Sequence, residues 1–378
     1  MEVIKEERKV EYSELIYDLI FVYIIGHNNS LLKDVSGGFV TSGMFWAYIL
    51  CTLAVIQIWS FTTFYINMYG RNGLRDHVFM FVNMYLLYFV AEGTRVHWHD
   101  YHGQYHTAWA AILINIGLQY LLELRNNKSD HDKVIIKRMS AVLFGEAAIV
   151  LAAIPAYNIS GIGLAPFAIL YGIIVTLFPG SGSRNSSVDF AHLSERAMLY
   201  VVFTFGEMII AISSYFEGEI SFNTIYFSLM AFLIVVGLFL SYGTIYDNII
   251  DREMSTSGLG YMLIHVFLIF SLNNITAALE FMHSEEVALM PKILFLMISF
   301  LIYFAFLFMT AKYAKLKCRP SKSFCVKMLL TAVSFVVIML LCRELMWVNI
   351  AITVVYVFAV YFVMYRIGSK TRHTASVD

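Results

Sequence analysis

The chain has 378 residues, of which 59% are hydrophobic and only 14% are charged, and its mean hydropathy is +0.70. Soluble domains carry about 25% charged residues, so this composition predicts an integral membrane protein whose first partner is the lipid bilayer. The formal net charge of −1 argues against a nucleic acid as a partner, because phosphate binding requires a basic surface.

Residues 1–12 form a short hydrophilic arm with neither the apolar core nor the small-residue cleavage site of a signal peptide. We expect the first apolar stretch to act as the targeting signal. The four cysteines show no CxxC spacing, so neither a disulfide framework nor a cysteine zinc site is predicted. No cofactor is required by any motif in the chain.

Runs of about 20 apolar residues bounded by polar turns predict twelve membrane-spanning helices. Because the runs lack the dyad alternation of barrel strands, helices are favoured over a β-barrel. The predicted helices cover 13–33, 43–68, 76–96, 105–124, 133–155, 160–178, 189–216, 219–247, 258–282, 287–314, 322–343 and 346–367.

The connections between these helices sort the basic residues by side. With the N-terminus in the cytoplasm, only Lys33, Arg95, Lys292 and Arg343 of the 26 basic residues fall on the outer side. Since cytoplasmic loops carry the excess of Lys and Arg, this bias predicts that both termini are cytoplasmic.

An offset of about 181 residues aligns Ser13-Glu14 with Ser194-Glu195, Tyr65 with Tyr246 and Asn67 with Asn248. These matches predict two parallel repeats of six helices each, related by an axis along the membrane normal. The predicted organisation is a cytoplasmic arm at 1–12, repeats at 13–178 and 189–367, an inter-repeat linker at 179–188 and a cytoplasmic tail at 368–378.

Acidic side chains recur inside the most apolar stretches. In the first predicted helix, Glu14 and Asp18 lie one turn apart on one face, and His27 follows deeper in the same helix. A charge at the middle of a bilayer costs on the order of 2.5 to 3.5 kcal/mol on insertion scales, so such residues face a protein interior or a wet cavity. Interhelical hydrogen bonding is the structural alternative for the polar residues of this helix.

The seventh predicted helix carries a parallel set, His192, Glu195 and Arg196, with Glu207 further along. Arg196 could neutralise Glu195 in its own helix or Asp18 in the other half of the chain. A structural ion pair and a transport role are equally open for Glu195 and Arg196. Glu207 has no cation within reach on its own helix and is predicted to gain and lose a proton.

Three further residues, in two predicted helices, are candidates. Glu146 follows Phe-Gly, as Glu207 does, and a glycine before the acid suits a closely packed helix crossing. Tyr246 and Asp247 end the eighth predicted helix, where an aromatic belt explains the tyrosine and Asp247 needs a partner such as Arg252 or Arg75.

Four histidines, His97, His99, His102 and His106, follow the third predicted helix within ten residues. They could hold zinc or another transition metal, although the spacing is loop-like and no cysteine contributes. A pH sensor on the outer face is an alternative use of these side chains.

Several of these segments resemble one known family. Glu14 to Val22 resembles the ELFYDLVFV-like opening motif of the bacterial low-temperature-requirement A family, and His192 to Arg196, with Gly206-Glu207, resembles its HLxERFG and GE signature. Tyr246-Asp247 with Arg252 resembles a third element. The chain departs from the pattern at Ala197-Met198, where the family has an aromatic residue and a glycine. The resemblance implies a multi-pass protein of the bacterial inner membrane, named for a cold-growth phenotype, and carries no biochemical activity with it.

The leading functional hypothesis is transport of a small ion or solute. A duplicated bundle with ionisable groups on its first and seventh helices is how many ion- or proton-coupled carriers place a pathway, and a channel is also compatible. The alternatives are a membrane-embedded enzyme acting on a lipid or another hydrophobic substrate, and a sensor or scaffold needed at low temperature. An enzyme is less favoured, since neither HExxH nor GxSxG is present.

Overall fold

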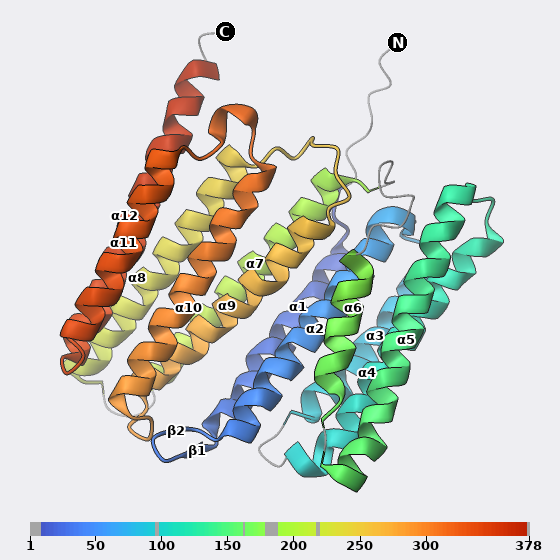
Figure 1. The fold of residues 1–378 in the computed structure, drawn as a ribbon, viewed down its shortest axis with the longest axis horizontal. Helices are drawn as coiled ribbons and strands as arrows, with labels where there is room; N and C mark the ends of the chain where they lie inside the picture. The colour runs from blue at the N-terminus through green and yellow to red at the C-terminus, as the bar shows by residue number, and fades with distance from the viewer. Residues whose placement is uncertain (1–8, 95–97, 162, 178–187, 217–219, 376–378) are drawn as a thin grey trace. The chain divides into compact units, whose positions relative to one another are not determined.

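The computed structural model describes residues 9–94, 98–161, 163–177, 188–216 and 220–375, and it is almost entirely helical over these ranges (Figure 1). A two-residue hairpin, β1 (Val35–Ser36) with β2 (Phe39–Val40), is the only sheet in the described ranges. The α-helices are α1 (Tyr12–His27), α2 (Ser42–Tyr69), α3 (Leu74–Glu92), α4 (Trp98–Leu122), α5 (Asp130–Ser160), α6 (Ala165–Leu177), α7 (Phe190–Ile212), α8 (Phe222–Thr244), α9 (Leu259–His283), α10 (Leu289–Met309), α11 (Lys322–Leu341) and α12 (Met346–Ala375).

Ten helical segments within the described residues are long and apolar enough to cross a membrane. The prediction of an all-helical, multi-pass membrane protein is therefore confirmed. Helices α3 and α6 are not among these ten segments. Arg75 and Asp76 bring charge into α3, and the 13 residues of α6 fall short of the roughly 20 that a span requires. The prediction of twelve spans, like that of cytoplasmic termini, stays a prediction.

The chain divides into two compact units. The first contains residues 1–34, 40–200 and 255–266, and the second contains 35–39, 201–254 and 267–378. The boundary falls inside α7 and α9, so the units do not coincide with the two predicted repeats. The predicted linker at 179–188 lies almost wholly outside the described residues, and the internal duplication stays a prediction.

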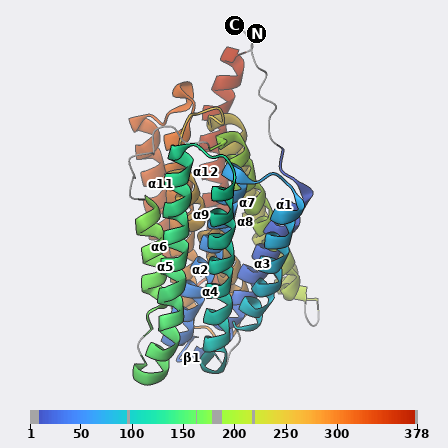
Figure 2. The same ribbon diagram turned by 90° about the vertical axis from the view of Figure 1, so that its right-hand side faces the viewer.

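In the first unit, α2 is the central helix and packs against α1, α4 and α6. Trp59 and Tyr65 of α2 are fully buried, and so is Trp109 of α4. Helices α4 and α5 run side by side in both views, with α3 against α4 (Figures 1 and 2). This packing encloses polar residues of α2 as well as apolar ones, and those polar residues build the sites described below.

In the second unit, α12 packs between α8 and α11. Gly237 permits the close approach of α8, because a Cβ atom there would lie 2.5 Å from a side-chain methyl carbon of Val357. Phe335 of α11 stacks on Tyr356 of α12 with ring centroids 4.1 Å apart. The apolar side chains of α11 that face away from α12, such as Leu329 and Val333, are exposed, as expected of a surface in contact with lipid.

Candidate functional site

The candidate site begins on α1, where Glu14 and Asp18 lie one turn apart on the buried face of the helix. Their side chains are 3% and 0% exposed, and Tyr17 and Phe21 on the same face are also fully buried. Ile16 and Tyr23 on the other face are exposed. The helical spacing of the acids therefore directs both carboxylates into the protein.

Arg196 of α7 joins the two carboxylates. Its guanidinium is fully buried; Nη2 forms an ion pair with Asp18 Oδ1, and Nη1 lies 3.3 Å from Glu14 Oε2. The planar guanidinium presents several N–H donors in a fixed fork, so one side chain can serve two acids at once. Of the two pairings that the sequence left open for Arg196, the structure contains the one with Asp18.

His192, one turn before Arg196, completes the cluster. Its Nε2 lies 3.4 Å from Glu14 Oε2, and its Nδ1 lies 3.0 Å from the Asn67 amide nitrogen. The Asn67 amide also pairs with the backbone of Asp189, donating to the carbonyl at 2.8 Å and accepting from the N–H at 3.0 Å. This pairing fixes the amide nitrogen toward His192, so Nδ1 accepts and the proton of a neutral imidazole is on Nε2, facing Glu14.

Asp18 has a second donor on α2. Trp59 donates its indole N–H to Asp18 Oδ1 at 2.8 Å, and the ring of Tyr200 packs edge-on against Trp59 with centroids 4.5 Å apart. The second oxygen, Asp18 Oδ2, is buried and accepts no hydrogen bond from the described part of the chain. Asp18 is thus bound by side chains from two helices, Trp59 of α2 and Arg196 of α7.

A chain of hydrogen bonds leads from the neighbouring Tyr17 toward α4. The Tyr17 hydroxyl lies 3.1 Å from Thr62 Oγ1 and accepts from Asn83 at 3.3 Å, and Asn83 accepts from Asn115 at 2.8 Å. These side chains come from α1, α2, α3 and α4. The face of α1 that carries the two acids is therefore bound by polar contacts to three other helices.

Among these four side chains, two carboxylates face one guanidinium. With both acids ionised and His192 neutral, Glu14, Asp18, His192 and Arg196 together carry one negative charge. Charge that is removed from water is costly. One proton or one monovalent cation would make the cluster neutral.

The other acidic candidates lie outside this cluster. Glu195 is half-buried and forms no ion pair with the described residues, although it adjoins Arg196 in the chain. Glu207 lies further along α7, in the second unit, where its side chain is half-buried. Glu146 of α5 is fully buried and accepts a hydrogen bond from Gln57 of α2 at 3.4 Å.

The remaining candidates take different positions. His27 ends α1 and stacks on Tyr23 with centroids 5.9 Å apart. Tyr246 lies buried in a π-helical turn, Ile245–Ile249, under the guanidinium of Arg252 at 5.4 Å. Asp247 in the same turn is exposed, so it does not need the ion-pair partner that we predicted.

The histidine cluster is described only in part. His97 lies outside the described residues, and so does the side chain of His99. His102 and His106 are buried on α4 with ring centroids 4.0 Å apart. The prediction of a loop is wrong for His102, whereas His106 lies within the helix predicted over 105–124. Among the described residues, no group of three or more His, Cys, Asp or Glu could hold a metal ion. The metal site stays a prediction.

Sequence reasoning missed a second charged cluster, around Glu123 at the end of α4. Glu123 is fully buried and pairs with Arg75, with Lys128 at 3.0 Å and with the Tyr65 hydroxyl at 3.1 Å. Arg75 had been considered as a partner for Asp247 instead. Glu123 lies at the end of the helix predicted over 105–124 and was not singled out there.

The fold and the buried ion pairs define a multi-pass helical membrane protein that carries charge inside its bundle. Residues 9–360 match the model of the family described as bacterial low temperature requirement A protein (LtrA). The chain belongs to this family, as the motifs around Glu14 and Arg196 had indicated. Neither the curated proteins nor the solved structures yielded a match.

Proposed function

We propose that this protein is an ion- or proton-coupled transporter of the bacterial inner membrane. In this proposal, the cluster of Glu14, Asp18, His192 and Arg196 binds the coupling proton or monovalent cation. The observation that carries it is the fully buried Arg196, whose single guanidinium lies between two buried carboxylates. Ionisable groups inside a membrane bundle commonly mark ion pathways and proton relays.

In this proposal the two acids have different roles. Asp18 has both Arg196 and Trp59 as partners, so it anchors the guanidinium. Glu14 has the longer contact to Arg196 and faces His192 Nε2 at 3.4 Å. Glu14 is therefore the acid that takes up the proton or contacts the cation, and His192 is placed to exchange a proton with it.

Uptake of a positive charge at Glu14 would weaken its contact with Arg196 and leave the guanidinium bound to Asp18 alone. A change in the pairing of one arginine is a local event that could shift α7 against α1, which is the kind of movement that alternating access requires. Glu207, further along α7, is proposed as a second acidic group of the pathway.

The test is ion flux into proteoliposomes that contain purified protein and an internal pH dye, under imposed proton, sodium and potassium gradients. We expect ion-dependent dye movement with the wild type and its loss in Glu14→Gln, because that cluster is neutral without an added charge. Glu195→Gln, one turn from His192 but outside the ion pairs, is the matched control for the cluster. Glu207→Gln tests the second position.

We expect the Glu14→Gln protein to fold. Size-exclusion chromatography and thermal unfolding check this. A wild-type protein that moves no ion under any gradient would overturn the proposal. A Glu14→Gln variant with unchanged flux would remove the cluster from the pathway. If Glu14→Gln loses flux only because it misfolds, Glu14→Asp separates the two causes, since it keeps the charge and shortens the reach.

A further inference from the structure

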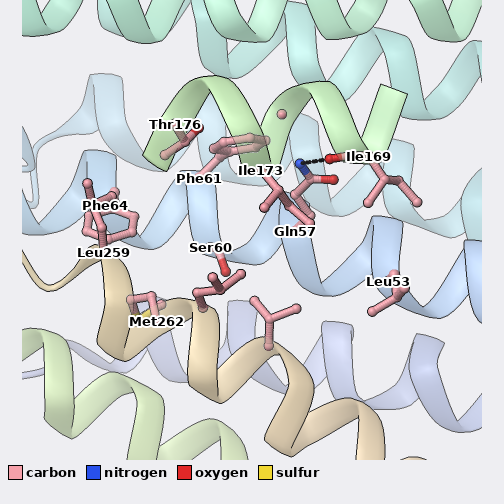
Figure 3. Close-up of a pocket in the computed structure, with 13 residues that line it drawn as sticks. Leu53, Gln57, Ser60, Phe61, Phe64, Ile169, Ile173, Thr176, Leu259 and Met262 are labelled. Atoms are coloured by element: carbon pink, nitrogen blue, oxygen red, sulfur yellow. Dashed lines mark hydrogen bonds between the residues drawn. The ribbon is translucent and has the colours of Figure 1, made fainter. Parts of the chain in front are cut away.

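A pocket lies on the opposite face of α2 from the charge cluster, between α2, α6 and the first turns of α9 (Figure 3). All of its lining residues belong to the first unit. Phe61, Phe64 and Met262 contribute to its mainly apolar wall, and Gln57, Ser60 and Thr176 are the polar residues among those that line it. Its volume is about 60 Å³.

A buried carboxylate lies directly behind this wall. Glu146 of α5 is fully buried, and its Oε2 accepts from the amide nitrogen of Gln57 at 3.4 Å. The same nitrogen donates to the Ile169 carbonyl at 3.3 Å, the bond drawn in Figure 3. Both contacts are long, since most N–H···O bonds fall between about 2.7 and 3.2 Å. One weakly bound amide thus separates the carboxylate from the pocket.

Gly172 brings the carboxylate close to the pocket from the α6 side. It lines the pocket, and a Cβ atom at this position would overlap both Glu146 Oε2 and the Gln57 amide nitrogen. The absence of a side chain at residue 172 is therefore what allows the two polar groups to reach the backbone of α6.

Four polar oxygens around the pocket have no hydrogen-bond partner among the described residues: Glu146 Oε1, Gln57 Oε1, Ser60 Oγ and Thr176 Oγ1. Buried polar atoms are ordinarily paired, and an unpaired one calls for an explanation. In addition, no arginine, lysine or histidine of the described ranges forms an ion pair with Glu146. All four atoms can accept hydrogen bonds, and one belongs to an acid, so a cationic donor would supply both the missing hydrogen bonds and the opposite charge.

We propose that this pocket binds a small alkylammonium cation. The alkyl part lies against the apolar wall, where Phe61 and Phe64 supply aromatic rings that also attract cations. The ammonium group donates to Gln57 Oε1 and Ser60 Oγ, and its charge is balanced by Glu146. Binding here goes beyond the proposed ion coupling at Glu14 and Arg196 and does not depend on it.

The volume of the pocket sets the size of the ligand. About 60 Å³ accommodates about four to six water-sized groups if each requires about 10 to 15 Å³. Propylammonium, with three carbons and one nitrogen, is therefore a suitable probe. n-Propanol has the same shape without the charge, and propionate has the opposite charge.

Binding is measured by ligand-observed NMR on the full-length protein in lipid nanodiscs, with empty nanodiscs as the blank for partition into lipid. We expect saturable propylammonium binding to the wild type, weaker binding of propanol and none of propionate. Glu146→Gln should bind propylammonium at least about tenfold more weakly, because one partner of a buried charge pair is lost. Its affinity for propanol should be unchanged.

Gly172→Ala should also lose propylammonium, since its Cβ atom displaces Gln57 and Glu146. Gly43→Ala, on α2 and with no atom within 4 Å of the added Cβ, is its matched control and should bind as the wild type does. If Glu146→Gln does not fold, Glu146→Asp keeps the charge, draws it back from the pocket and should bind more weakly.

Three outcomes would overturn the proposal: no saturable propylammonium binding to the wild type, equal binding of propanol and propylammonium, or undiminished propylammonium binding in a folded Glu146→Gln protein. Glu14→Gln should bind propylammonium as the wild type does. These variants distinguish a failure of the proposed ion coupling at the cluster from a failure of the proposed amine site.

Discussion

Two buried acidic sites lie on either side of α2 in the first unit, and they differ in how their charge is balanced. Trp59 faces Asp18 and the guanidinium of Arg196, whereas Gln57, two residues earlier and about 200° around the helix, faces Glu146. Asp18 has a cation and an indole donor, and Glu146 has one long amide hydrogen bond. Burial is nearly the same, so burial alone does not decide what an acid does.

The difference shows which kind of substitution each site should tolerate. A carboxylate that is paired with a buried arginine holds that arginine in place, and removal of either leaves the other uncompensated. A carboxylate without a cation contributes little to folding and leaves room for a ligand to supply the charge. Substitution of Arg196 or Asp18 should therefore damage the fold, and substitution of Glu146 should not.

Arg196→Gln should have the largest effect. It leaves Glu14 and Asp18 buried without their cation, and breaking a buried pair in this way costs about 3 to 5 kcal/mol. We expect a loss of this size in the free energy of unfolding, measured by titration with SDS in mixed micelles. Glu195→Gln, adjacent in the chain but outside the ion pairs, should change it by less than about 0.5 kcal/mol. An unchanged stability of Arg196→Gln would mean that water reaches and solvates the cluster.

Trp59→Phe should come next. It removes the indole N–H that donates to Asp18 and keeps most of the aromatic packing against Tyr200. A hydrogen bond to a charged group contributes about 1.5 to 3 kcal/mol, and we expect a loss in this range by the same titration. In the Asp18→Asn background, Trp59→Phe should lower the free energy of unfolding by less than it does in the wild type. A double-mutant cycle measures this difference. Equal effects in both backgrounds would mean that the lost ring volume is the cause.

Gly172→Ala should destabilise by about 1 to 3 kcal/mol, because the added methyl group overpacks the contact between α6, Gln57 and Glu146. Gly43→Ala adds the same methyl group to a helix at an open position, where alanine is favoured over glycine by about 0.5 to 1 kcal/mol. The two substitutions should thus shift the unfolding transition in opposite directions. If both substitutions shift the unfolding transition in the same direction, there is room for the added methyl group beside the Gln57 amide.

Part of the main site could be predicted from the sequence. Helical spacing put Glu14 and Asp18 on one face, and the parallel motif at residues 192–196 offered Arg196 as a partner for either Asp18 or Glu195. Trp59 and Asn67 could not be predicted as the groups that hold this cluster. Their role depends on which face of α2 meets α1 and α7, and an almost uniformly apolar helix has no polar face that would reveal its orientation.

The aligned positions of the two halves show a second limit. Asn67 and Asn248 match at the offset of about 181 residues, yet Asn67 bonds Asp189 and His192 while Asn248 donates to the carbonyl of Thr244 in its own turn. Helix α4 shows a third limit of the sequence-based prediction, because the helix begins at Trp98 in a polar stretch where hydropathy predicts a loop. Hydropathy finds the apolar middle of a helix and misses polar turns that extend it.

Glu146→Gln should have the smallest effect, and it should stabilise the protein. Glutamine keeps the shape of the side chain, removes the uncompensated charge and can donate to Gln57 Oε1, which has no partner among the described residues. We expect the free energy of unfolding to rise by about 0.5 to 1.5 kcal/mol, the net contribution of one hydrogen bond, in amine-free buffer. Asp18→Asn, the same change at an acid paired with Arg196, should lower it. If Glu146→Gln also lowers stability, Glu146 has a cation partner in the folded protein, and the two sites balance their charge in the same way.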